Sequence, residues 1–64
     1  MITINGVSQN SAGLTLDDLL KNEGYEKPKI AVGLNGQVVP KTEYSAIILK
    51  DGDVVEVFHF MGGG

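Results

Sequence analysis

The chain has 64 residues, no cysteine, one histidine, and five lysines against eight carboxylates, which give a net charge of −3. This composition excludes disulfides, catalytic thiolates and cysteine-based zinc sites, and it argues against binding to nucleic-acid phosphates. No apolar run approaches the roughly 20 residues of a membrane span, and the start lacks the basic region of a signal peptide. We therefore expect one small acidic domain in the cytoplasm, in contact with neither membrane nor nucleic acid.

The first third of the chain predicts a hairpin followed by one short helix. Asn5-Gly6 favours a two-residue turn that pairs Ile4 with Val7. Thr15 is the expected helix N-cap and Gly24 the expected stop. Between them lies an apolar stripe at helical spacing, formed by Leu16, Leu19 and Leu20. A helix of about nine residues is too short to be stable alone, so we expect it to pack against a sheet.

The rest of the chain predicts a second hairpin and a long final strand. Residues 30–34 and 37–39 flank Asn35-Gly36, and residues 53–60 form the segment with the strongest strand propensity. Tyr44, in the irregular stretch between them, is expected to cover the core. Together these elements predict an α+β protein of the β-grasp type. Its mixed sheet would have four to five strands, one helix across one face and the final strand at the centre.

The final strand presents two different faces. Because side chains alternate along a strand, Val55 and Val57 are expected to face the helix. The opposite face then receives Val54, Glu56, Phe58 and Phe60. One short helix covers only one side of a sheet, so we expect Phe58, Phe60, Glu56 and the adjacent Met61 to form a partner-docking surface. The alternative is that both phenylalanines lie under loops in a small core.

The remaining polar candidates favour structural roles over catalysis. His59 is the one obvious general base, but no nucleophile is placed to pair with it, so we expect a structural or half-solvated histidine. Asp51 and Asp53 flank a glycine and predict a turn rather than a calcium loop. Lys41 and Lys50 are expected to be solvated. The chain therefore resembles a protein that is acted upon, with no catalytic constellation of its own.

The last residues suggest where such action would take place. Gly62-Gly63-Gly64 follows the final strand and connects it to no further element. Glycines without Cβ atoms form a slender chain that can thread a narrow channel and present the carboxylate of Gly64 to an enzyme. The alternative is a frayed end without function. We therefore divide the chain into a β-grasp domain, residues 1–60, and a flexible glycine tail, residues 61–64.

Several motifs resemble those of a known family. The run Leu49-Lys50-Asp51-Gly52-Asp53-x-Val55-Glu56, followed by a strand and a terminal diglycine, resembles the ubiquitin-like sulfur carriers, above all the ThiS family of thiamin biosynthesis. The opening Ile-x-Ile-Asn hairpin, Thr15-Leu16-x-x-Leu19-Leu20 and Leu34-Asn35-Gly36-x-x-Val39-Pro40 occur in the family's order. The resemblance thus spans nearly the whole chain, with one additional glycine, Gly62, before the diglycine.

The resemblance implies a mechanism in which the chain is a substrate and not an enzyme. A ubiquitin-activating-type adenylyltransferase would use ATP and magnesium to adenylate the Gly64 carboxylate, while Gly62 and Gly63 thread its active site. Sulfur from a cysteine desulfurase would then displace AMP and leave a thiocarboxylate, which thiazole synthase would accept. The carrier itself would bind no cofactor or metal. A molybdopterin-synthase small subunit, a ubiquitin-like protein modifier and a β-grasp interaction module with an inert tail remain alternatives.

Overall fold

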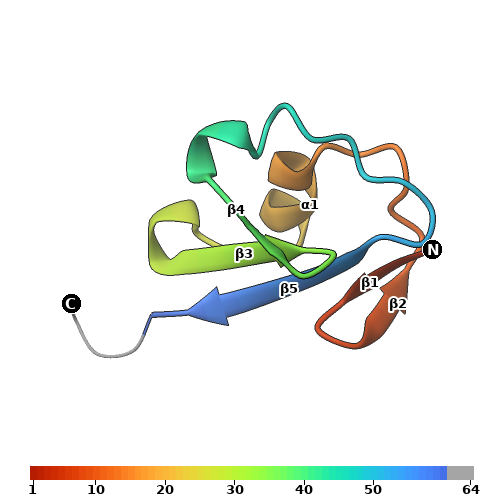
Figure 1. Ribbon diagram of the computed structural model, residues 1–64, viewed down its shortest axis with the longest axis horizontal. Helices are drawn as coiled ribbons and strands as arrows, with labels where there is room; N and C mark the ends of the chain where they lie inside the picture. Colours follow the sequence, from red (N-terminus) through yellow and green to blue (C-terminus); the bar gives the residue numbers. More distant parts are fainter. Residues whose placement is uncertain (61–64) are drawn as a thin grey trace.

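The computed structural model describes residues 1–60 as a five-stranded mixed sheet with one helix on one face (Figure 1). The strands are β1 (Ile2–Ile4), β2 (Val7–Gln9), β3 (Ile30–Leu34), β4 (Gln37–Val39) and β5 (Val54–His59). Their order is β2-β1-β5-β3-β4. β1 and β5 are parallel, and the other neighbours are antiparallel. The predicted α+β, β-grasp fold and the central position of the final strand are confirmed.

Both predicted hairpins form, and the asparagine of each is hydrogen-bonded to β5. Asn5 and Asn35 adopt positive φ angles of 48° and 51°, the left-handed conformation that two-residue hairpin turns require. The Oδ1 atom of Asn5 accepts from the N–H of Val57 at 2.9 Å, and that of Asn35 accepts from the N–H of Val54 at 2.9 Å. The two turns therefore supply backbone partners to the central strand as well as reversing the chain.

Helix α1 (Leu16–Asn22) is capped at both ends by the predicted residues. The N–H of Asp18 donates to Thr15 Oγ1 at 3.1 Å. At the other end, Gly24 N–H donates to the Lys21 carbonyl at 3.1 Å and Tyr25 N–H to the Leu20 carbonyl at 3.0 Å, which is a Schellman motif. This cap begins before Gly24, so the helix has seven residues rather than about nine.

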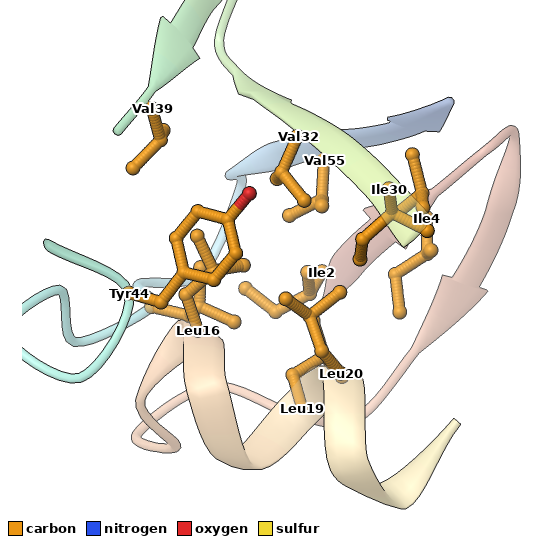
Figure 2. Close-up of a cluster of buried hydrophobic side chains, with 12 residues drawn as sticks. Ile2, Ile4, Leu16, Leu19, Leu20, Ile30, Val32, Val39, Tyr44 and Val55 are labelled. Carbon is orange, nitrogen blue, oxygen red and sulfur yellow. The ribbon is translucent and has the colours of Figure 1, made fainter. Parts of the chain in front are cut away.

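The hydrophobic core lies between α1 and the sheet (Figure 2). It contains Ile2, Ile4, Leu16, Leu19, Leu20, Ile30, Val32, Val39, Tyr44, Leu49, Val55 and Val57. Tyr44 is fully buried, although it follows a 3₁₀ turn, η2 (Lys41–Glu43), in a stretch that was expected to be irregular surface. A second 3₁₀ turn, η1 (Lys27–Lys29), leads into β3. Tyr44 is thus a central member of the core.

The hydroxyl of Tyr44 is buried without a hydrogen bond among the described residues. Figure 2 shows it directed toward Val32. Burial raises the pKa of Tyr44, because removal from water penalises the phenolate, and the nearby backbone of Val32 offsets this only in part. No hydrogen bond of ordinary geometry forms there, so the hydroxyl is a destabilising element in an otherwise apolar core.

Candidate functional site

The side of the sheet opposite α1 carries exposed apolar side chains. On β5, Val55 and Val57 are buried, whereas Val54 is 43% exposed, Phe58 56% exposed and Glu56 exposed. The predicted alternation is confirmed, and the alternative that Phe58 lies under loops is wrong. Val38 of β4 joins this side. We refer to Val38, Val54, Glu56 and Phe58 as the open face.

Small residues on the neighbouring strand β3 leave the larger side chains of the open face accessible. In the β3–β5 register, Ala31 pairs with Phe58 and Gly33 with Glu56. A Cβ atom at Gly33 would lie 4.0 Å from Glu56 Oε1, so the carboxylate extends over the glycine. Glu56 thus places one negative charge amid apolar side chains. A protein surface of apolar character with a basic side chain at its centre would complement it.

Phe60 lies just beyond β5 and is 62% exposed, so it does not lie under loops either. Its N–H donates to the carbonyl of Lys29 at 3.1 Å. The ammonium group of Lys41 lies 5.5 Å from the centroid of the Phe60 ring and donates a hydrogen bond to the carbonyl of Ile30. The expectation that Lys41 is simply solvated is therefore wrong. The signal in the sequence that could have indicated the contact between Lys41 and Ile30 is the pairing of β3 with β4, which places Lys41 opposite Ile30 when it is continued past Pro40.

His59 is exposed, although its position along β5 has the same parity as the buried valines. Its ring centroid lies 5.4 Å from that of Tyr25, with the planes tilted by 45°. Helix α1 ends at Asn22, and the partly buried Tyr25 is the side chain that reaches His59. The histidine therefore packs at the edge of the core, which agrees with a structural role.

The acidic turn before β5 has a structural explanation. Asp53 is buried, with 9% of its surface exposed to solvent. Its Oδ2 atom accepts from the N–H of Lys50 at 2.8 Å and its Oδ1 atom from the amide of Asn35 at 3.1 Å. These hydrogen bonds hold the pKa of Asp53 below its usual value. The turn reading is confirmed, and within residues 1–60 no group of three or more His, Asp or Glu could hold a metal ion.

The predicted site residues fall into two groups. Glu56 and Phe58 lie on the open face, and Phe60 lies at the end of the same strand. Met61, Gly62, Gly63 and Gly64 lie outside the described residues. The docking surface and the glycine tail therefore remain predictions.

Across the part of the chain that is described, no helix is long and apolar enough to cross a membrane.

The fold places the chain in the class of ubiquitin-like β-grasp proteins. A family model described as the ThiS family matches residues 2–64, and the chain belongs to that family. It is 35% identical over 66 residues to the sulfur carrier protein ThiS of Bacillus subtilis, with both chains covered completely. The crystal structure of the thiamine biosynthesis protein ThiS from Geobacter metallireducens superimposes with a TM-score of 0.78 at 34% identity, covering 98% of this chain and 97% of that one.

A further relative is a much longer protein. The thiazole synthase of Magnetococcus marinus is 44% identical over 64 residues, which is 98% of this chain but 20% of that protein. The chain thus spans about a fifth of the length of this relative. A segment similar to this chain thus forms part of a protein named thiazole synthase.

Proposed function

We propose that this chain is a sulfur carrier protein of thiamin biosynthesis, with the carboxylate of Gly64 as its reactive group. The observation that carries the proposal is the ThiS family match, which continues through residue 64. The sheet supports it, because its central strand bears the exposed Phe58 and leads into the glycine run. In this role the chain is a protein substrate, and the catalytic groups belong to its partners.

The proposed chemistry follows from the low reactivity of a carboxylate. An adenylyltransferase of the ubiquitin-activating type would transfer AMP from ATP to Gly64, with magnesium and release of pyrophosphate. This step converts a poor leaving group into a good one. A cysteine desulfurase would supply sulfur as a persulfide, whose attack on the adenylate would release AMP and form an acyl disulfide. Reduction of this disulfide by a thiol would then leave a thiocarboxylate, which is a good soft nucleophile. Because the reaction consumes ATP, we place it in the cytoplasm.

Thiazole synthase is the proposed acceptor of the sulfur. The matched relative from Magnetococcus marinus bears that name and contains a segment that is 44% identical to this chain. Fusion of a carrier to the enzyme that accepts its sulfur is expected to help the reaction, because joining two partners in one chain raises their effective concentration. A molybdopterin-synthase large subunit is the competing acceptor. A pull-down with this chain as bait, tested for both proteins, would distinguish the two alternatives.

The open face, together with Phe60 and Met61, is the proposed docking surface for these partners. Phe58 and Phe60 supply exposed aromatic area, which contributes strongly to binding when a partner covers it. Glu56 supplies a charge that orients the partner. Gly62 and Gly63 would then enter the partner's active site, where side chains would obstruct a narrow channel.

Intact-mass spectrometry of the protein from sulfur-replete cells tests the proposal. A carrier should show a species in which sulfur replaces one oxygen at the carboxyl end of Gly64. The variant that lacks Gly64 is the matched control and should show none. Ladders of conjugates would instead favour a protein modifier. A mature chain that continues past Gly64, or wild-type protein that forms neither adenylate nor thiocarboxylate with an activating enzyme and ATP, would refute the proposal.

A further inference from the structure

The hairpin of β3 and β4 ends just before a position that would extend it. Val32 pairs with Val39 and Leu34 with Gln37, so a continued ladder would place Lys41 opposite Ile30. Pro40 has no N–H, and the chain turns there into η2. The donor that reaches the Ile30 carbonyl is accordingly the side-chain ammonium of Lys41. Lys41 thus occupies a defined place at the edge of the sheet.

The same ammonium group lies 5.5 Å from the centroid of the Phe60 ring, within the range of a cation–π contact. Phe60 is also held through its backbone, because its N–H donates to the carbonyl of Lys29 at 3.1 Å. Phe60 is the last residue that the structure describes. Lys41 therefore joins β3 to the residue from which the chain continues toward Gly64.

We propose that Lys41 is a positioning residue: by holding the Phe60 ring, it sets the direction in which the chain leaves the sheet. This inference rests on the proposed function, since it concerns delivery of the Gly64 carboxylate. Lys41 does not act on the reacting atoms, and its effect passes through Phe60.

The length of the remaining chain explains why this direction would matter. Gly64 is the fourth residue after Phe60, which corresponds to at most about 14 Å of extended chain. The direction in which the chain leaves Phe60 therefore limits the region that the carboxylate can reach. Misplacement of a reacting group by about 1 Å can reduce a rate by about 100-fold. Every Lys41 variant retains the open face and the Phe60 side chain that form the docking surface, so the inference predicts a defect mainly in turnover rather than in binding.

Three substitutions at one position separate the two contacts of Lys41. Lys41→Met removes both the hydrogen-bond donor and the charge. Lys41→Gln retains a donor for the Ile30 carbonyl but removes the cation, and Lys41→Arg retains both. Lys50→Met is the matched control, because Lys50 is also exposed and hydrogen-bonds to Asp53 through its backbone N–H.

The kinetic experiment measures ATP–pyrophosphate exchange by the activating enzyme from the same organism, with each carrier as the varied substrate. We expect Lys41→Met and Lys41→Gln to lower kcat about tenfold, with KM unchanged within about twofold. Lys41→Arg and Lys50→Met should behave as the wild type. A rise in KM at constant kcat would mean that Lys41 contacts the partner directly. Wild-type kinetics of Lys41→Gln would mean that Lys41 only satisfies the Ile30 carbonyl. Either result overturns the inference.

Amide hydrogen exchange tests the contact without any partner. Lys41→Met should accelerate exchange at Phe60 while leaving Val57, in the centre of β5, at the wild-type rate. Unchanged protection at Phe60 would overturn the inference even if the carrier is active. If the wild-type chain is not adenylated at all, the proposed function itself fails. Normal adenylation of every Lys41 variant would refute the positioning role alone.

Discussion

Replacement of Phe58 by alanine should weaken partner docking by up to about two orders of magnitude. A phenylalanine side chain presents about 200 Å², and Phe58 is 56% exposed in the free chain. About 110 Å² therefore remains for a partner to cover, worth about 2.8 kcal/mol at about 25 cal/mol per Å², or roughly 100-fold in Kd. Titration calorimetry against the activating enzyme measures this change.

The control is a substitution on the other face of β5 that lowers the free energy of unfolding by about as much as Phe58→Ala does. The buried part of Phe58 corresponds to a loss of about 1–2 kcal/mol of folding stability on truncation. Val57→Ala, at a position that is 7% exposed, should cost about 2 kcal/mol in stability and leave the open face intact. Wild-type affinity of Phe58→Ala, or equal loss of affinity in both variants, would refute the assignment of the open face as the docking surface.

Three further outcomes follow from the structure. Tyr44→Phe removes the unpartnered hydroxyl and should increase the free energy of unfolding by about 1 kcal/mol, which raises the melting temperature. A lower melting temperature of the variant in thermal scans would mean that the hydroxyl is hydrogen-bonded. The Lys50 N–H and the Asn35 amide lower the pKa of Asp53 in the folded state. The contribution of the Asp53 carboxylate to folding stability should therefore be complete above about pH 4, and it should disappear as the pH falls through the lowered pKa. Urea titrations should show that Asp53→Asn is less sensitive than the wild type to pH in that acidic range, and parallel curves would contradict this. Deletion of Gly64 should abolish adenylation, measured by pyrophosphate exchange, while the far-ultraviolet circular dichroism spectrum and melting temperature stay unchanged; loss of the fold would contradict the separation of tail and domain.

Local sequence signals predict most of the fold because each has a short-range physical cause. Asn5-Gly6 and Asn35-Gly36 specify tight turns through their backbone conformation. Both hairpins form, and the first has the expected pairing of Ile4 with Val7. The alternation of Val55 and Val57 with Glu56 and Phe58 correctly separates the buried side of β5 from the open face. These predictions require knowledge of only a few neighbouring residues.

The features that the sequence does not predict depend on contacts between distant segments. The sequence predicts that Tyr44 covers the core, but nothing in residues 41–45 indicates the 3₁₀ turn η2 that folds it there. Lys41 is engaged because Pro40 ends the ladder and leaves the Ile30 carbonyl for a side chain. His59 is exposed because α1 ends at Asn22, and Tyr25 packs against its ring. Register and helix length, rather than local pattern, decide the positions of Lys41 and His59.

The central position of β5 has a mechanical consequence. The strand lies between β1, which runs parallel to it, and β3, which runs antiparallel. A load applied at the carboxyl end of the chain would be borne by hydrogen bonds on both of its edges, which break together rather than one at a time. We therefore expect a pull on this end of the chain to meet more resistance than it would if the last strand lay at an edge of the sheet.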